Sequence, residues 1–147
     1  MNVKAILAAK KRNLGGDIIS IEPTADLAAA AKCLASHRIG AVLIRGAGGR
    51  LAGILSERDI VRSLAEHGPS ALDLPVGQVM TRDVETCRED EAVAVIMERM
   101  TARKFRHLPV MRNGDLVGII SIGDVVKERV GEIEAEQEAM RDYIRSA

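Results

Sequence analysis

The chain has 147 residues, of which 47% are apolar, and its 21 Lys and Arg residues are balanced by 21 Asp and Glu residues. This length allows one compact domain or two small lobes around a shared core. The charge balance argues against a nucleic-acid-binding protein, which would carry a basic excess. Phe105 and Tyr143 are too few aromatic residues to stack successive bases. No apolar run approaches the roughly 18 residues of a membrane-spanning helix.

The start of the chain and its cysteines indicate a cytoplasmic protein. Residues 1–11 lack a long apolar stretch followed by small residues, so we expect no signal peptide. Cys33 and Cys87 lie far apart without a CxxC motif, and we interpret both as reduced, buried small side chains. The three histidines are also dispersed, so no metal site is predicted.

The first predicted elements are a lead segment, a strand and a helix. The lead segment covers residues 3–7, and the cationic cluster that follows it, residues 10–12, is interpreted as a solvated surface loop. A strand is expected from Ile18, and Thr24 is expected to cap the next helix. The apolar face of that helix has the spacing i, i+3, i+4, i+7 and consists of Leu27, Ala30, Ala31 and Leu34.

Two further strands and a second helix complete this series. The apolar runs 39–44 and 51–55 read as strands joined by the Gly-rich turn 46–49, and the second helix begins at Ser56. Residues 66–75 contain Gly and Pro and read as a linker.

The same series occurs a second time. Residues 18–44 fall on residues 84–110 after a shift of 66 positions without a gap. The second copy is preceded by its own lead segment, 76–80, and Asp90 is its expected helix cap. Its strands are joined by Asn113-Gly114, a strong hairpin signal. We expect a first repeat at 1–68, a linker at 69–75, a second repeat at 76–130 and a helical tail at 131–147.

This pattern predicts a fold of the α/β (α+β) class with two β-α-β-β-α repeats and a C-terminal helix. A three-stranded sheet with two helices leaves one sheet face uncovered. Two such copies can bury these faces against each other, which predicts a pseudo-two-fold arrangement.

The tail has the spacing of a coiled-coil seam. Its apolar positions are separated by alternating steps of four and three residues, with one polar member, and Glu and Arg surround them. We expect this helix to pack against a partner subunit in a homodimer, the alternative being that it folds back on its own domain. The seam consists of Val126, Val130, Ile133, Gln137, Met140 and Ile144.

One motif whose side chains could take part in binding or catalysis occurs in both copies. It consists of Gly, two apolar residues, Ser, two further residues and Asp. It covers residues 53–59 and 118–124. Its simplest interpretation is a capping box, in which Ser56 or Ser121 caps a helix and Asp59 or Asp124 bonds back to the cap residue. A functional site is the second interpretation.

The order of elements, the duplication and these two motifs resemble a tandem pair of cystathionine-β-synthase (CBS) domains, a Bateman module of the stand-alone bacterial kind. The resemblance covers roughly residues 3–130 and leaves no room for a catalytic domain. It implies that Asp59 and Asp124 bind ribose hydroxyls, and that Ser56 and Ser121 reach ribose or phosphate. It also implies a disk-like homodimer.

The resemblance further implies basic residues at the phosphate end of the ligand. Arg106 and His107 occupy the positions at which the resemblance implies these basic residues, whereas the matched positions of the first copy are uncharged. Arg58 is a further phosphate candidate, and its counterpart is Gly123. The two predicted sites are therefore unequal, and a single tight site for a phosphorylated ligand should include Arg106. Solvated or packed side chains are the alternative interpretation for this basic pair.

The base of the ligand is expected beside an edge strand. Pro109 lacks an N–H group and is excluded from central ladder positions, so its strand is predicted to be an edge or to be splayed there. A cleft beside it could admit adenine, and an ordinary edge strand is the alternative. The candidate aliphatic contacts for the base are Ile19, Val42 and Val84.

The sequence therefore favours a non-enzymatic regulatory module that binds an adenine nucleotide, without an obligatory cofactor. AMP is the first candidate and NAD(H) or ATP comes next. The output is expected to pass through an effector protein or a change in the dimer. The alternatives are a dimerisation or interaction module without a ligand and, less favoured, an enzyme acting on a nucleotide. No nucleophile–base pair, P-loop or GxGxxG motif supports the enzyme.

Overall fold

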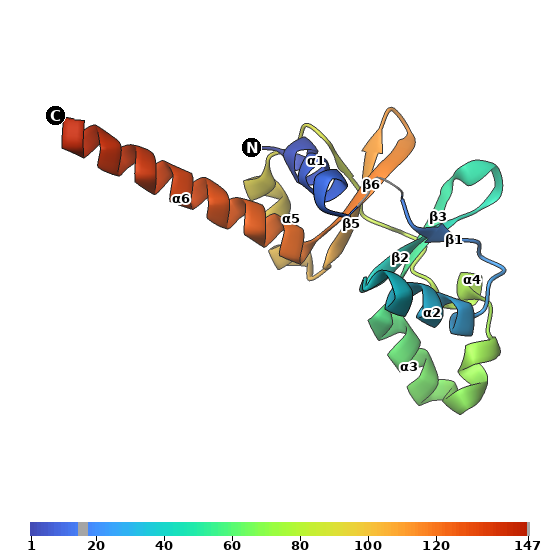
Figure 1. The fold of residues 1–147 in the computed structure, drawn as a ribbon. Helices are drawn as coiled ribbons and strands as arrows, with labels where there is room; N and C mark the ends of the chain where they lie inside the picture. Colours follow the sequence, from blue (N-terminus) through green and yellow to red (C-terminus); the bar gives the residue numbers. More distant parts are fainter. Residues whose placement is uncertain (15–17, 147) are drawn as a thin grey trace. The chain divides into compact units, whose positions relative to one another are not determined.

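The structure is a computed structural model that describes residues 1–14 and 18–146, with the side chains of residues 11–14 left aside. Its contacts divide the chain into two compact units. We call Asp17–Glu85 the first-repeat unit, and Met1–Gly16 together with Thr86–Ala147 the second-repeat unit. Each unit contains one three-stranded sheet, so the predicted α+β fold with two β-α-β-β-α repeats is confirmed (Figure 1).

In the first-repeat unit, the central strand pairs in parallel with a short strand on one side and in antiparallel with a longer strand on the other. The sheet order is β1-β2-β3. The elements are β1 (Ser20–Ile21), α2 (Leu27–His37), β2 (Ala41–Arg45), η1 (Ala47–Gly49), β3 (Leu51–Ser56), α3 (Glu57–His67), η2 (Gly68–Asp73) and α4 (Val76–Val79).

The second-repeat unit has the same arrangement, with sheet order β4-β5-β6. It differs by a long first helix and a much longer last helix. Its elements are α1 (Val3–Leu14), β4 (Cys87–Arg88), α5 (Val93–Arg103), β5 (His107–Arg112), β6 (Asp115–Ser121) and α6 (Ile122–Ser146). The predicted helical tail is thus the end of α6, which continues the last helix of the repeat without a break.

The apolar faces of the repeated helices form the two cores, as their spacing predicts. Helix α2 buries Leu27, Ala30 and Leu34, and α5 buries Val93, Ile96 and Met100 at the matching positions. The cores also contain the inner residues of the strands. The hairpin at Asn113-Gly114 is confirmed as well, since both residues have positive φ (50° and 84°), as this type of turn requires.

The predicted caps of these two helices are wrong. Asp26, not Thr24, caps α2 and accepts a hydrogen bond from Ala29 N at 2.8 Å. Helix α5 begins after Ala92 without a side-chain cap, so Asp90 does not cap it. The first N–H group of α5 donates instead to the carbonyl of Met1 at 3.3 Å. A backbone partner from a distant segment has replaced the local cap.

Each unit includes the lead segment of the other repeat. Helix α1, the lead segment of the first repeat, packs against the second repeat, where Val3 and Ile6 enter the core. Helix α4, the lead segment of the second repeat, packs against the first repeat through Val76. Equivalent backbone bonds hold both leads, with Val3 N to Glu91 O at 3.0 Å and Val76 N to Ala25 O at 2.7 Å. The compact units and the sequence repeats are therefore different divisions of the chain.

The prediction of a solvated loop at residues 10–12 is wrong, because α1 extends to Leu14. The linker is also ordered: it contains the end of α3 and the helix η2, in which Ala71 is buried.

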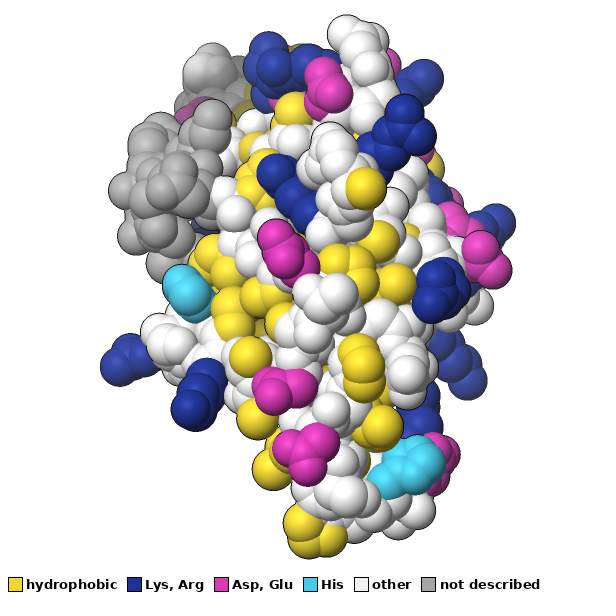
Figure 2. All heavy atoms as spheres, turned by 90° about the vertical axis from the view of Figure 1, so that its right-hand side faces the viewer, with side chains coloured by type: hydrophobic (Ala, Val, Ile, Leu, Met, Phe, Trp, Pro, Cys, Tyr) yellow, Lys and Arg dark blue, Asp and Glu magenta, His cyan; other side chains and the backbone are white. Residues whose placement is uncertain are grey.

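The surface carries charges of both signs. Figure 2 shows Lys, Arg, Asp and Glu side chains interspersed with apolar ones, without a continuous patch of one sign on this face. In the described part of the chain, no helix combines the length and apolarity needed to cross a bilayer. The same residues contain no cluster of three metal-ligating side chains.

Both cysteines are free thiols. Burial and the charge of Glu91, opposed by Arg99, together raise the pKa of the Cys87 thiol to about 12. Cys33 is only half-buried.

Candidate functional site

The Ser–Asp motif forms a complete capping box at the start of α3. Ser56 N donates to Asp59 Oδ2 at 2.9 Å, and Asp59 N donates to Ser56 Oγ at 3.3 Å. The Ser56 hydroxyl also lies 3.1 Å from Asp59 Oδ2. On its other oxygen, Asp59 faces the exposed Arg62 at 3.6 Å. The predicted capping role of this motif is confirmed.

The motif of the second repeat forms the same box at the start of α6. Ser121 N donates to Asp124 Oδ2 at 2.8 Å, and Asp124 N donates to Ser121 Oγ at 3.2 Å. The Asp124 side chain is 26% exposed, compared with 12% for Asp59. The carboxylate of the second repeat is therefore the more accessible of the two.

The capping boxes leave one early N–H group for an anion in each helix. The first four N–H groups of a helix have no partner within it. In α3, those of Ser56 and Asp59 are engaged in the box, and that of Glu57 donates to Gly40 O at 2.9 Å. The remaining group is that of Arg58. In α6, the group left in the same way belongs to Gly123, which has no side chain to obstruct it.

Asp124 has a cationic partner from a distant part of the sequence. The Lys10 ammonium on α1 donates to Asp124 Oδ2 at 2.9 Å and to Ile119 O at 2.8 Å. At the matched place of the first-repeat unit, Ile54 O accepts instead from the backbone of Thr81, at 2.9 Å. Because α1 is still helical at this point, its backbone is not free to pair with β6, and the Lys10 side chain supplies the donor.

The lead segments also explain the glycine of each motif. A side chain at Gly53 would begin 2.5 Å from Thr81 O and 2.7 Å from Met80 Sδ. A side chain at Gly118 would begin 2.7 Å from Leu7 Cδ2. These glycines let the lead segments approach β3 and β6, which is a packing role that needs no ligand.

The environment of Asp124 keeps it ionised. Burial is the largest influence on its pKa and raises it. The backbone bond from Ser121, the hydrogen bond and charge of Lys10 and the Ser121 hydroxyl together outweigh burial, so that the pKa lies below its ordinary value of 3.8. An ionised, partly exposed carboxylate is the form that accepts two hydrogen bonds from a diol.

We expect the substitution Lys10→Met to raise the pKa of Asp124, because burial is then opposed by Ser121 alone. Since the folded pKa is depressed in the wild type, the stabilisation from this carboxylate is complete above its ordinary pKa and is lost as the pH falls through the folded value. The stability difference between wild type and variant should therefore shrink below about pH 4. NMR titration of the Asp124 carboxyl carbon measures the shift.

Lys4→Met is the matched control, because Lys4 lies on the same helix and is exposed. An Asp124 midpoint that stays unchanged in Lys10→Met would show that the ion pair does not form in solution.

The basic residues predicted for the phosphate end lie at the same end of the second-repeat unit as its capping box. Arg106 O accepts a hydrogen bond from Ile122 N, the first residue of α6, at 2.8 Å. His107 is the cross-strand partner of Ser121. The matched residues of the first repeat occupy equivalent places: Gly40 O accepts from Glu57 N, and Ala41 pairs with Ser56. The second-repeat box therefore has two basic residues beside it at the places where the first-repeat box has uncharged ones.

Several other residues predicted to contact the ligand lie in the first-repeat unit. Arg58 is exposed at the second position of α3, beside Asp59. Ile19 and Val84 are half-buried residues of the first-repeat unit, and they lie one and three residues before the first strand of their repeats. Val42, on β2, is 1% exposed and belongs to the core of that unit. Val84 thus follows the lead segment into the unit of the other repeat.

The prediction that Pro109 lies on an edge strand is wrong, because β5 is central in its sheet. The alternative, a splayed strand, agrees with the register. Strand β4 pairs with β5 only at Val110 and Met111. Pro109 therefore precedes the two-residue ladder, so the N–H group that proline lacks is not needed there.

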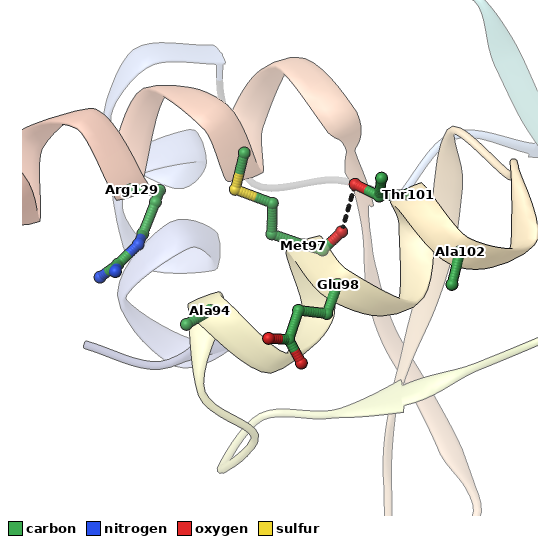
Figure 3. Close-up of a pocket in the computed structure, with 6 residues that line it drawn as sticks. All are labelled: Ala94, Met97, Glu98, Thr101, Ala102 and Arg129. Atoms are coloured by element: carbon green, nitrogen blue, oxygen red, sulfur yellow. Dashed lines mark hydrogen bonds between the residues drawn. The ribbon is translucent and has the colours of Figure 1, made fainter.

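A cavity of about 500 Å³ lies elsewhere, between α5 and α6. In Figure 3, Glu98 and Met97 come from α5 and Arg129 from α6, while the Thr101 hydroxyl donates to Met97 O at 2.8 Å. The cavity shares no residue with either capping box. We place the candidate site on the capping boxes, because each combines a carboxylate with a helix N-terminus, and the box of the second repeat adds an ionised Asp124 and neighbouring basic residues.

Two small sheets, each with a Ser–Asp box at the end of its third strand, define a duplicated module. A family model described as the CBS domain matches residues 13–66 and 76–131. The chain therefore belongs to the CBS domain family. CBS domain pairs are generally regulatory, ligand-binding modules rather than catalysts.

Solved and curated relatives agree with this assignment. A CBS-domain-containing protein from Agrobacterium tumefaciens is 42% identical, with a TM-score of 0.81 over 87% of this chain and 92% of that one. A mitochondrial CBS-domain-containing protein of Arabidopsis thaliana is 34% identical over 79% of this chain. A CBS domain pair crystallised with 5′-methylthioadenosine and S-adenosyl-L-methionine is 28% identical, with a TM-score of 0.76 over 90% of this chain and 98% of that one. The chain spans only 58% to 64% of the length of the first curated relatives.

Lys10 is the residue at the candidate site that sequence reasoning missed. It lies 114 positions before Asp124. It also lies at the start of the first repeat, so the repeat alignment assigns it to the box of Asp59 rather than to that of Asp124. One sequence feature pointed to this residue: the first lead segment is followed by a basic cluster and the second is not.

Proposed function

We propose that the chain is a regulatory module that binds an adenine nucleotide, with AMP as the first candidate and NAD(H) or ATP next. The observation that carries the proposal is the box of the second repeat, where an ionised, accessible Asp124 lies at a helix N-terminus close to Arg106 and Lys10. The carboxylate would bind the ribose diol. The N–H group of Gly123 and the basic side chains would bind phosphate.

The related CBS domain pair solved with 5′-methylthioadenosine and S-adenosyl-L-methionine supports a ligand that contains adenosine. Neither of those ligands carries a phosphate. The choice of AMP therefore rests on the basic residues of this chain, Arg106 and His107 together with Lys10. Binding would then act on an effector protein or change a homodimer.

The test is a calorimetric titration of the full chain with AMP, ADP, ATP, NAD, 5′-methylthioadenosine and S-adenosyl-L-methionine. We expect AMP to bind at least about tenfold more tightly than 5′-methylthioadenosine, since one charge-assisted hydrogen bond to phosphate contributes about 1.5–3 kcal/mol. Tighter binding of the phosphate-free ligands would overturn the choice of AMP.

Two other results would favour the alternative functions. No heat with any of the six compounds would contradict nucleotide binding and leave the capping boxes as purely structural, as in a dimerisation module. Consumption of a nucleotide, followed by chromatography, would indicate an enzyme.

A further inference from the structure

The C-terminal half of α6 has no contacts that would stabilise it within the described chain. The helix has 25 residues, and every residue from 133 to 146 is exposed. Figure 1 shows this half running away from α1 and α5, the neighbours of its first turns. Isolated helical segments of this length are marginal in water, because most helical stability comes from packing. We therefore expect a partner to stabilise this half of the helix.

Helix α6 carries an apolar seam that begins in its packed half and continues through its exposed half, beside the face that packs on its own unit. The packed face includes Val125, which is fully buried, and Glu132, whose side chain is 14% exposed. The five apolar residues of the seam lie on the adjacent face and are between 38% and 67% exposed. The seam keeps the alternating four-and-three spacing of a two-stranded coiled coil. It consists of Val126, Val130, Ile133, Gln137, Met140 and Ile144.

We propose that the partner is the same helix of a second copy, in a parallel, in-register two-stranded coiled coil. In the heptad notation of this seam, Arg129 and Glu136 occupy g positions, and Glu134 and Arg141 occupy e positions. A parallel coil brings each g residue close to the e residue five positions later on the other chain. Both pairings are then of opposite charge: Glu136 with Arg141, and Arg129, which also bonds Glu132 of its own helix at 2.8 Å, with Glu134. By symmetry each pair occurs twice.

The antiparallel arrangement of the same seam places like charges together. Antiparallel coils bring g residues close to g residues and e residues close to e residues. With the seams aligned, Glu136 would face Glu136, Glu134 would face Glu134, and Lys127 would face Arg141. Like charges in such contacts destabilise a coil by amounts similar to the gain from opposite charges. The charge pattern therefore selects the parallel orientation.

Gln137 supports the same arrangement. In the parallel, in-register coil the two Gln137 side chains face each other and can exchange a hydrogen bond. In the antiparallel coil each amide faces an apolar Ile133 and loses its partner, which is unfavourable for a buried polar group. A single polar residue at such a core position is a known means of specifying register.

The first test is a charge exchange in the full chain, followed by sedimentation equilibrium. Glu136→Arg places Arg opposite Arg141, and we expect the dimer to weaken about tenfold, because two attractive pairs become repulsive. Arg141→Glu alone should have the same effect, and the double variant should return to within about threefold of the wild type. Glu138→Arg changes the net charge equally on the outer face, and it should leave the dimer unchanged.

The second test measures orientation by crosslinking. Ile144→Cys is made in a Cys33→Ser background, while Cys87 is buried and is left in place. In a parallel coil the two introduced thiols face each other and form a disulfide when oxygen is supplied with a copper catalyst. In an antiparallel coil each introduced thiol lies opposite residue 126 of the other chain, so the two thiols are about 27 Å apart along the axis. A disulfide needs Cα atoms within about 7 Å. Glu138→Cys, on the outer face, is the control.

Rapid crosslinking at residue 144 together with rescue by the double charge exchange would confirm the proposal. A monomeric wild type, a double variant as weak as the single variants, or crosslinking at residue 138 as fast as at 144 would each overturn it. These readouts do not depend on a nucleotide, so their failure would leave the proposed ligand binding untouched.

Discussion

Gly53→Ala should lower the free energy of unfolding by about 2–4 kcal/mol. The added methyl group would lie 2.5 Å from the carbonyl oxygen of Thr81, and a backbone atom cannot move aside as a side chain can. Its displacement would also strain the two backbone bonds between Ile54 and Thr81, at 2.9 and 3.0 Å. Overpacking typically costs about 1–3 kcal/mol, and each hydrogen bond contributes about 1 kcal/mol. Chemical denaturation measures the change.

Gly118→Ala is the matched control, and it should cost less than about 1 kcal/mol. Its methyl group would meet Leu7 Cδ2, the end of a flexible side chain that can adopt another rotamer. Alanine is also favoured over glycine within a strand by about 0.5–1 kcal/mol, which offsets part of the contact. Equal losses in both variants would show that the glycines are needed for a reason other than the approach of the lead segments.

Asp124→Asn should weaken AMP binding about 10- to 150-fold, the range expected for the loss of hydrogen bonds to a charged group worth about 1.5–3 kcal/mol. Asn retains an oxygen for the Ser121 N–H group, so the cap is kept. Removal of a negative charge would by itself strengthen the attraction to phosphate. A loss of affinity therefore reports the contact with the ribose. Calorimetry of the full chain measures it.

The matched variant, Asp59→Asn, should leave the tight affinity for AMP within about threefold. The first-repeat box has Gly40 and Ala41 where the second has Arg106 and His107, so charge-assisted contacts with phosphate favour the second. As a further check, wild type should prefer AMP to its 2′-deoxy form, and the Asp124→Asn variant should not. An equal loss in both variants would mean that the two boxes contribute equally, and no loss in either would refute the proposed site.

Local patterns predicted most of the fold. The apolar faces of α2 and α5 follow from a helical spacing that holds wherever one face of a helix is buried. The Asn113-Gly114 hairpin follows from backbone conformations that these two residues adopt at low cost. The capping boxes involve partners three residues apart. In each case the interacting groups are neighbours in sequence, so the residue types alone indicate the geometry.

The Thr24 error was local, because Asp26, two residues later, caps α2. Two other errors have a different cause. The local pattern favours Asp90 as a cap, but the carbonyl of Met1 satisfies the start of α5. Proline is excluded only where a neighbouring strand needs its N–H group, and the short ladder of β4 does not reach Pro109. Both outcomes depend on how far a neighbouring segment extends, and no residue within the element indicates that.

The sequence by itself determined the duplication, the CBS type of fold, the two Ser–Asp boxes and their unequal basic neighbours, because these are local patterns that recur after 66 and then 65 positions, or differences between matched positions. Only the tertiary structure decided which lead segment joins which repeat. Both leads offer a similar short apolar stretch to either sheet, and chain connectivity allows either choice. That decision brings Lys10 to Asp124 rather than to Asp59, because an ion pair depends on distance in space and not on separation along the chain.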